Sequence, residues 1–208
     1  MANGPRPLVL GSTSRYRREL LERLGLPFTV ASPDLAETIL PGETPAHTAL
    51  RLAEAKARAV AARYSNALVI GSDQVADCAG RPVGKPGTRA VALAQLRSLS
   101  GQTVVFHTGV ALADAASGRC RSVLVDVAST FRTLNDAEII AYLDREEPYD
   151  CAGSVKSEGL GIALFHGIAS DDPTALIGLP LIALTRLLRE EGVDVLMPSL
   201  SSSLSSKC

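Results

Sequence analysis

One stretch decides the fold of this chain: Leu8-Val-Leu-Gly-Ser-Thr-Ser-Arg-Tyr-Arg-Arg-Glu-Leu-Leu21. Its first three residues are apolar and predict a buried strand that ends at Leu10, and the small residues 11–14 predict a tight turn. Ser14 is a favourable N-cap for the helix that follows. The apolar residues of that helix share one face: Leu20, Leu21 and Leu24. The stretch therefore predicts a strand, a turn and an amphipathic helix in direct succession.

This turn is typical of a phosphate site. The first backbone N–H groups of a helix have no partner within the helix, and the helix dipole favours an anion there. The hydroxyl groups of Ser12 and Ser14 and the guanidinium of Arg17 would face the same anion. The alternative is an ordinary strand-turn-helix with Arg17 on its solvent-exposed face, because the turn matches neither a Walker loop nor the GxGxxG fingerprint.

Composition places the chain among ordinary globular proteins. It has 208 residues, of which 46% are hydrophobic and 21% charged. We expect a single two-lobed domain over residues 1–196 and a Ser-rich disordered tail over residues 197–208. The net charge of −1 argues against a broad nucleic-acid surface, which needs clustered Lys and Arg, but is compatible with a small anionic ligand.

The cysteines favour a reducing compartment. Cys78, Cys120, Cys151 and Cys208 are far apart and form no CxxC pair, which argues against a zinc site and a disulfide framework. The N-terminal residues lack the apolar stretch of a secretion signal, and no segment reaches the roughly 18 apolar residues of a membrane span. We therefore expect a cytoplasmic protein.

Strand-like and helical segments alternate, and one long hairpin interrupts them, which predicts an α/β fold with a mixed sheet. Strands are expected at Leu8–Leu10, Phe28–Ala31 and Leu68–Ile70, and the hairpin at Thr103–Ala113 and Arg121–Phe131. Helices are expected at Thr44–Tyr64, Thr88–Ser98, Asn135–Leu143 and Leu181–Glu190. Thr44 would cap the first of these helices, with Pro45 at its first position.

A second polar group follows the apolar residues Leu68–Ile70, in Gly71-Ser-Asp73-Gln. The pattern predicts that the strand ends in a Gly-Ser turn, which presents the Asp73 carboxylate. A carboxylate held at such a strand end acts as a general base on water or as a metal ligand. The alternative is a turn aspartate that caps its own backbone.

Two lysines are candidates for binding phosphate. Lys85 lies between glycine and proline in Gly84-Lys85-Pro86, a setting that would fix its charge opposite phosphate. Lys56 lies in a helical segment that also carries Glu54. For both lysines the alternative is an ordinary solvated position on the surface.

Small residues surround one lysine and one carboxylate in Cys151-Ala-Gly-Ser-Val-Lys156-Ser-Glu158-Gly-Leu-Gly161. The glycines allow a ligand or another chain to approach the backbone, and Lys156 and Glu158 would contact different edges of that ligand. Further on, Asp171-Asp172-Pro is a candidate for binding a divalent cation, or an ordinary turn. Three histidines lack metal-ligand spacing and are expected at surface or strand positions: His47, His107 and His166.

In their order and spacing, these motifs resemble the Maf family of nucleoside triphosphate pyrophosphatases over about Leu8 to Glu191. The matching elements are Ser12-x-Ser14 with Arg17, Glu37, Arg51-Leu-Ala-x-x-Lys56, Gly71-Ser-Asp73-Gln, Gly84-Lys85-Pro86, Ser100-Gly101, Phe131-Arg132, Ala152-Gly153 and Gly178-Leu-Pro180. Each element is short, but their shared order and spacing argue against coincidence.

The resemblance implies an α/β fold of the Maf and ITPase-like type, with a mixed, elongated central β-sheet flanked by helices and two lobes around a nucleotide cleft. It also implies cleavage between the α and β phosphates of a nucleoside triphosphate, with a divalent metal cation, Mg or Mn. Asp73 would accept a proton from water and, with Glu37, hold the metal. The residues that would surround the triphosphate are Ser12, Ser14, Arg17, Lys56 and Lys85. A homodimer is also what the family suggests.

Within the family, Gln74 and the pattern Lys156-Ser-Glu158-Gly resemble the subgroup that acts on 7-methyl-GTP. A 7-methylguanine base is positively charged and stacks on an aromatic ring such as that of Tyr16. Its N1 and N2 donors suit a carboxylate such as Glu158. Tyr16, Gln74 and Glu158 are therefore the expected specificity residues.

Two alternatives stay open at this point. The first is a pyrophosphatase for other nucleotides, either dTTP and UTP or non-standard purines, which would share the catalytic residues and differ at the base. The second is a non-catalytic nucleotide-binding regulator of cell division, a class that the balanced charge supports poorly. Release of diphosphate separates an enzyme from a regulator.

Overall fold

The computed structural model describes residues 6–197 and contains one seven-stranded mixed sheet with the order β2-β1-β3-β5-β6-β7, in which β4 also pairs with β3. The strands are β1 (Leu8–Leu10), β2 (Phe28–Val30), β3 (Leu68–Cys78), β4 (Arg81–Val83), β5 (Thr103–Asp114), β6 (Cys120–Phe131) and β7 (Phe165–Ala169). The helices are α1 (Arg15–Glu22), α2 (Pro45–Ala61), α3 (Arg89–Leu99), α4 (Asp136–Glu146) and α5 (Leu181–Glu190), with short 3-10 helices η1 (Ala152–Ser154), η2 (Leu160–Leu164) and η3 (Ala175–Ile177). The expected α/β fold is confirmed. Apart from Met197, the Ser-rich tail lies outside the described residues.

The strand, turn and helix of the opening stretch fold as predicted, but the helix ends at Glu22, before Leu24. β1 pairs in parallel with both β2 and β3, and all three of its residues are buried. The chain then turns, and α1 begins at Arg15 with Ser14 as its N-cap, whose side chain accepts a hydrogen bond from the Arg17 N–H at 3.4 Å. A strand buried on both faces thus delivers the turn to the end of the parallel part of the sheet.

The predicted Gly-Ser turn before Asp73 is wrong, because β3 continues without interruption to Cys78 and pairs antiparallel with β5 over ten residues. Gly71 serves close packing. A Cβ atom there would collide with the carbonyl oxygen of Ala53 in α2, and one at Gly109 in β5 would lie 2.6 Å from the Ala49 oxygen. The glycines therefore let α2 lie directly on the sheet.

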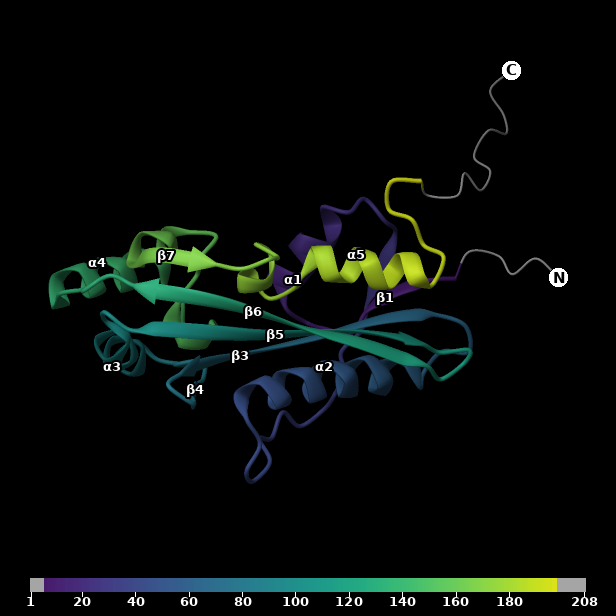
Figure 1. The fold of residues 1–208 in the computed structure, drawn as a ribbon, viewed down its shortest axis with the longest axis horizontal. Coiled ribbons are helices and arrows are strands. Elements are labelled where there is room, and N and C mark those ends of the chain that lie inside the picture. The colour runs from purple at the N-terminus through teal and green to yellow at the C-terminus, as the bar shows by residue number, and fades with distance from the viewer. Residues whose placement is uncertain (1–5, 198–208) are drawn as a thin grey trace, which may run out of the picture.

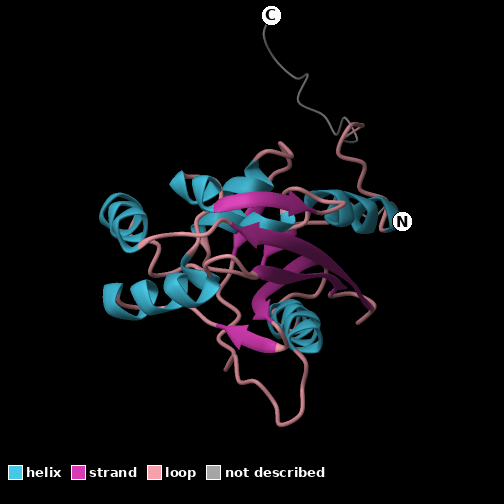
Figure 2. Ribbon diagram, turned by 60° about the vertical axis from the view of Figure 1, so that its left-hand side comes forward, coloured by secondary structure: helices cyan, strands magenta, loops and turns pink. Residues whose placement is uncertain are grey.

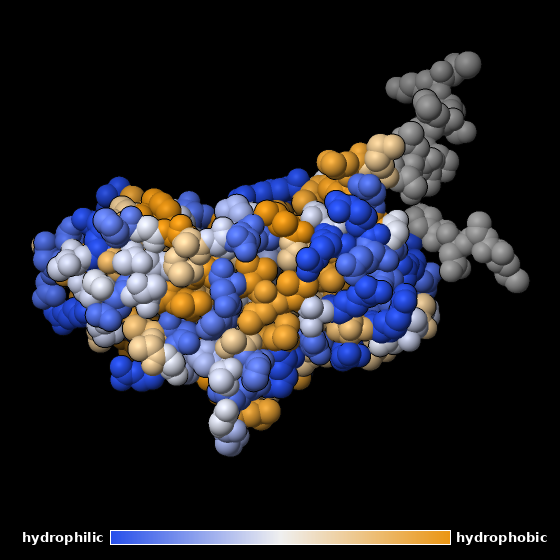
Figure 3. Space-filling view, in the orientation of Figure 1, coloured by the Kyte–Doolittle hydropathy of each residue, from blue (hydrophilic) through white to orange (hydrophobic). Residues whose placement is uncertain are grey.

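The predicted hairpin is confirmed as β5 and β6, which are 12 residues each and run the length of the molecule in Figure 1. β7 pairs with β6 only over Ala128–Phe131. Over the remainder of β6, between α5 and α2, Figure 3 shows hydrophobic side chains on the surface, and residues 123–125 are partly exposed there.

Helices cover the two faces of the sheet differently. α2 lies along one face, and α1 and α5 lie along the other (Figures 1 and 2). α2 buries alanine and valine side chains against β1 and β3, which suits its close approach. It ends three residues before the predicted end, and α4 runs three residues beyond Leu143. These are ordinary shifts of helix ends.

The long strands carry separate hydrophobic clusters toward their two ends. At one end, α1 and α5 pack on Leu10 and Ile70. At the other end, α3 and α4 pack around Phe106 and Phe131. β4 and β7 in this second part were not predicted, because β4 is three residues long with a central proline and β7 is five residues long and mostly exposed. No helix within residues 6–197 is long and apolar enough to cross a membrane.

Candidate active site

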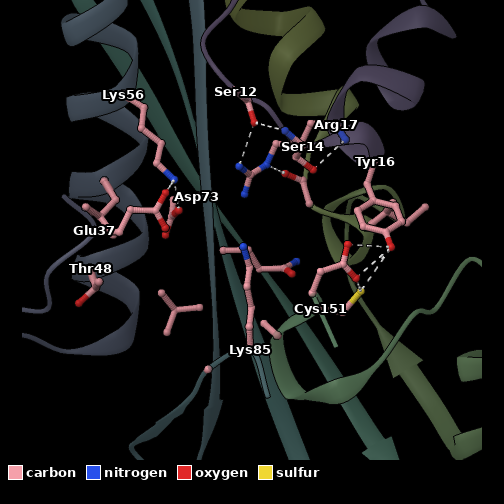
Figure 4. A pocket seen from close by; sticks show the side chains of 18 of the residues that line it. Ser12, Ser14, Tyr16, Arg17, Glu37, Thr48, Lys56, Asp73, Lys85 and Cys151 are labelled. Carbon is pink, nitrogen blue, oxygen red and sulfur yellow. Dashed lines mark hydrogen bonds and ion pairs between the residues drawn. The ribbon is translucent and has the colours of Figure 1, made fainter. Parts of the chain in front are cut away.

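A cavity of about 460 Å³ lies where the turn after β1, the middle of β3 and the loops of the α3–α4 end meet. Its size is typical of a site for a small ligand. Ten of the candidate residues line it: Ser12, Ser14, Tyr16, Arg17, Glu37, Lys56, Asp73, Gln74, Lys85 and Glu158. Three other candidates do not line it: Lys156, Asp171 and Asp172. Figure 4 shows Lys56, Glu37 and Asp73 on one side and Ser12, Ser14, Arg17 and Tyr16 on the other, with Lys85 between them.

The turn after β1 forms the first wall. Ser12 is 4% exposed, and its Oγ lies 3.2 Å from the Ser14 backbone N and 3.4 Å from Arg17 Nη1. Arg17 also donates from Nε to the carbonyl oxygen of Gly178 at 2.9 Å. Arg17 therefore faces the cavity, which rules out the alternative that it lies on a solvent-exposed helix face. Ser12 in the turn and Gly178 near the C-terminus of the chain thus hold the guanidinium from two sides.

Gly178 holds a further contact that sequence reasoning missed. The hydroxyl of Ser72 in β3 lies 2.9 Å from the Gly178 oxygen and 2.8 Å from the Gly109 oxygen. Gly178 has a φ of 120°, a conformation that favours glycine. The motif Gly178-Leu-Pro180 was the available signal for this residue, but its contact with Arg17 crosses 161 positions of sequence.

The opposite wall carries a buried cluster of opposite charges. Lys56 is 3% exposed, and its Nζ lies 2.6 Å from Asp73 Oδ1 and 2.5 Å from Glu37 Oε1. Asp73 is 6% exposed in β3, whereas Glu37 comes from the loop before α2 and is about half exposed. Glu54 points elsewhere and accepts a hydrogen bond from Ser122. Lys56 is therefore no solvated helix residue, and Asp73 caps no turn.

The pKa values of the two carboxylates shift in opposite directions although both carboxylates contact Lys56. Burial raises the pKa of Asp73 above 3.8, and the charges of Lys56 and Arg17 oppose this only in part. Partial burial also raises the pKa of Glu37, but the hydrogen bond and charge of Lys56, with Lys85 and Arg17, outweigh it and leave the pKa below 4.5. The deeper carboxylate is thus the better proton acceptor and the outer one the more persistent anion.

The loop that carries Glu37 is tied to α2 beside Lys56. Arg51 donates from Nε and Nη2 to the two oxygens of Glu43, each at 2.6 Å, and from Nη2 to the Thr38 carbonyl at 2.9 Å. A bidentate pair of this kind fixes orientation as well as distance. The loop of Glu37 is therefore anchored to α2, the helix that carries Lys56.

Lys85 extends into the cavity from the loop after β4, and Figure 4 shows its amine directed toward the centre. The loop is held by η1 and α3, because the Gly84 carbonyl accepts hydrogen bonds from the Gly153 N–H at 3.3 Å and from Gln95 Nε2 at 3.1 Å. Pro86 is buried. The exposed lysine thus stands on an anchored backbone.

Tyr16 marks the far end of the cavity. Its hydroxyl accepts from Arg15 Nη2 at 2.6 Å and lies 3.3 Å from Asp150 Oδ1, and the Arg15 guanidinium carbon is 4.7 Å from the ring centroid. The Cys151 thiol lies 3.7 Å from the same hydroxyl, and burial raises its pKa to about 12, so it stays protonated. Neither Asp150 nor Cys151 was predicted here, because no motif links them to Tyr16.

Gln74 and Lys156 are used largely within the protein. Gln74 Nε2 lies 2.9 and 3.0 Å from the carbonyl oxygens of Ala175 and Leu176 in η3, which leaves its oxygen as the atom that can reach a ligand. Lys156 Nζ donates to Glu146 at 2.6 Å, so its charge is directed at α4. Glu158 lines the cavity, and desolvation raises its pKa above 4.5.

The interpretation of Asp171 and Asp172 as a cation site is wrong. Asp172 is buried and accepts hydrogen bonds from Thr174 and from the N–H groups of Ile182 and Ala183 at 2.7 and 3.2 Å. Asp172 therefore caps the start of α5, where Pro180 occupies the local cap position and makes no such bond. Both aspartates border a second cavity, and residues 6–197 contain no group of three His, Cys, Asp or Glu side chains arranged for a metal.

Comparison with known proteins adds a family and relatives. The model of a family described as Maf-like protein matches residues 7–191. The chain is 63% identical to a 7-methyl-GTP pyrophosphatase of Polaromonas sp. strain JS666, over 90% of this chain and 86% of that protein. It is 58% identical to a protein of the same name from Cupriavidus metallidurans, over 92% of this chain and 97% of the other, and 60% identical to one from Burkholderia pseudomallei, over 92% and 90%.

Among solved structures, the fold is similar to that of a HAM1 protein from Coxiella burnetii. The TM-score is 0.52 at 16% sequence identity, and the match covers 89% of this chain and 100% of the other. At this identity the likeness concerns the fold alone. It agrees with the expected elongated mixed sheet flanked by helices.

Proposed function

Since this chain belongs to the Maf-like protein family, we propose that it is a pyrophosphatase that hydrolyses 7-methyl-GTP to 7-methyl-GMP and diphosphate. One observation carries the proposal. The chain brings Arg17, Lys56 and Lys85 together with Asp73 and Glu37 in one cavity of about 460 Å³. The relatives at 56–63% identity that carry the name 7-methyl-GTP pyrophosphatase support the choice of substrate.

The cations supply what this reaction needs most. Water attacks a phosphorus surrounded by anionic oxygens, and fixed positive charges offset the repulsion and stabilise the charge that develops on the leaving diphosphate. The triphosphate would lie between the Ser12 turn with Arg17 on one wall and Lys56 on the other, with Lys85 extending between them. Because Arg17 is held by Gly178 and Ser12, its charge is oriented before the substrate binds.

Asp73 is the proposed proton acceptor. Its carboxylate is buried and held by Lys56 at 2.6 Å, with a pKa raised by burial. Water would transfer a proton to Asp73 as its oxygen forms a bond to the α phosphorus. The bond from that phosphorus to the bridging oxygen then breaks, and diphosphate leaves with the electron pair.

Two carboxylates in the cavity, Glu37 and Asp73, suit a divalent cation. Lys56 Nζ lies within 2.6 Å of both Glu37 and Asp73, so the two carboxylates stand side by side in the cavity. Carboxylate oxygens suit Mg²⁺, which is often bound by one or two carboxylates and completed by substrate phosphates and water. The metal would neutralise phosphate charge when bound, and Glu37 and Asp73 would hold it.

The base would occupy the end of the cavity that holds Tyr16 and Glu158. Tyr16 lines the cavity, and in this proposal its ring stacks on the cationic base. Glu158 would accept hydrogen bonds from the N1 and N2 donors of 7-methylguanine. Gln74 would contribute its oxygen, since its nitrogen is engaged by η3.

A substrate panel tests this proposal. Diphosphate release by the purified chain is measured with 7-methyl-GTP, GTP, ITP, UTP and dTTP under one condition with Mg²⁺. The expected result is the highest kcat/KM for 7-methyl-GTP. Faster cleavage of UTP or dTTP contradicts the proposed substrate, and nucleotide binding without diphosphate release contradicts the enzyme.

A further inference from the structure

We propose that Glu146, at the end of α4 and outside the cavity, is a positioning residue that sets nucleotide selectivity by holding the loop of Glu158. This inference rests on the proposed function, because it assumes that Glu158 contacts the base. Neither Glu146 nor Lys156 lines the cavity.

The contacts of Glu146 enclose Glu158 on both sides. Oε1 accepts from Lys156 Nζ at 2.6 Å, two residues before Glu158, and Oε2 accepts from the Leu160 N–H at 2.6 Å, two residues after it. The exposed fractions of the two charged side chains are 11% for Glu146 and 25% for Lys156. One carboxylate thus fixes both ends of the five-residue segment that presents Glu158.

The segment is built around this carboxylate. A Cβ atom on Gly159 would lie 2.6 Å from Glu146 Oε2, so the backbone approaches as closely as glycine allows. The Lys156 carbonyl accepts from the N–H groups of both Gly159 and Gly161 at 3.1 Å, which closes the turn. Tyr142, one turn earlier on α4, accepts from the Lys156 N–H at 3.0 Å. The loop therefore follows α4 as a unit.

Glu146 lies where a carboxylate needs compensating contacts. A negative charge at the C-terminal end of a helix opposes the helix dipole. Glu146 is the last residue of α4, and Glu147 beyond it adopts a φ of 47°. The hydrogen bond from Lys156 and the Leu160 N–H compensate, and they keep the pKa of Glu146 below 4.5. The same pairing accounts for Lys156, whose ammonium is committed to Glu146 and is therefore not the group that reads the base.

The experiment compares selectivity, defined as the ratio of kcat/KM for 7-methyl-GTP to that for UTP, in the full chain. Glu146→Gln keeps the shape but loses the charge, and we expect the ratio to fall about tenfold or more, through a higher KM for 7-methyl-GTP with little change in kcat. Asp144→Asn is the matched control, since Asp144 lies on the same helix and pairs with Arg89 at 2.6 Å away from the loop. Its ratio should equal that of the wild type.

A double-mutant comparison shows whether Glu146 acts through Glu158. In a Glu158→Ala background the added Glu146→Gln change should leave the ratio where Glu158→Ala alone puts it. An unchanged ratio in Glu146→Gln, or an equal further fall in the Glu158→Ala background, would overturn the inference. If Glu146→Gln fails to fold, Lys156→Met decides by the same ratio. If the wild type prefers another nucleotide, the proposed substrate is wrong. The role of Glu146 is then tested by the ratio of kcat/KM for the preferred nucleotide to that for the other nucleotides.

Discussion

Lys56 and Asp73 form a buried ion pair between α2 and β3, with Nζ 2.6 Å from Oδ1. The pair spans 17 positions of sequence and exists because Gly71 lets α2 approach β3 two residues before Asp73. The packing of a helix on a strand thereby sets the proposed proton acceptor beside a cation.

Replacement of Asp73 should separate chemistry from binding. Asp73→Asn retains an oxygen for Lys56 but no longer accepts a proton, so we expect kcat to fall by about 10²- to 10⁴-fold. Binding of a non-hydrolysable 7-methyl-GTP analogue, measured by calorimetry, should persist. Full activity in this variant would remove Asp73 from the role.

The metal requirement should depend on Glu37. Chelation with EDTA should abolish diphosphate release, and Mg²⁺ or Mn²⁺ should restore it. Glu37→Gln should raise the Mg²⁺ concentration for half-maximal activity by about tenfold or more. Glu22→Gln, which alters an exposed pair on α1, serves as the control. An unchanged Mg²⁺ dependence in Glu37→Gln would show that this carboxylate does not hold the metal.

The Glu43–Arg51 pair should make stability depend on pH. The hydrogen bonds from Arg51 lower the pKa of Glu43 from 4.5 to about 2. Because the pKa is lower in the folded state, the pair stabilises the protein above pH about 4.5, and this contribution is lost as the pH falls toward 2. The free energy of unfolding in urea should therefore decline less steeply between pH 5 and 3 in Glu43→Gln than in the wild type. Parallel curves would contradict the assignment.

Asp172 should matter for stability and not for the metal. Asp172→Ala leaves the N–H groups of Ile182 and Ala183 without their acceptor, and we expect a loss of about 1–2 kcal/mol in the free energy of unfolding. Asp172→Asn, which keeps an acceptor, should lose less. The Mg²⁺ dependence of activity should be the same in the wild type and both variants. A changed Mg²⁺ dependence in the Asp172 variants would show that Asp172 contributes to a cation site.

Local patterns predicted the elements that depend on local physics. The strand, turn and helix of Leu8–Leu21 follow from apolar residues, small residues and the Ser14 cap, and each is present in the structure. Gly71 shows where this reasoning fails. A glycine before a serine is typical of a turn, but here it is required by the backbone of α2, which a local pattern does not contain.

The same limit applies to the site. The residue types in the cavity could be predicted, since phosphate chemistry requires cations, carboxylates and hydroxyls. Their partners could not. Arg17 depends on Gly178 at a separation of 161 positions, and Tyr16 meets Asp150 at a separation of 134. Gln74 and Lys156 were expected to contact the ligand directly, but tertiary contacts engage their nitrogens within the protein.

The most direct test of the account is a competition. The purified protein is given equal concentrations of 7-methyl-GTP and UTP in ¹⁸O-labelled water with Mg²⁺, and the products are identified by mass spectrometry. The account predicts 7-methyl-GMP in excess over UMP, with the label in the monophosphate and unlabelled diphosphate. UMP in excess, or release of orthophosphate in place of diphosphate, would contradict it.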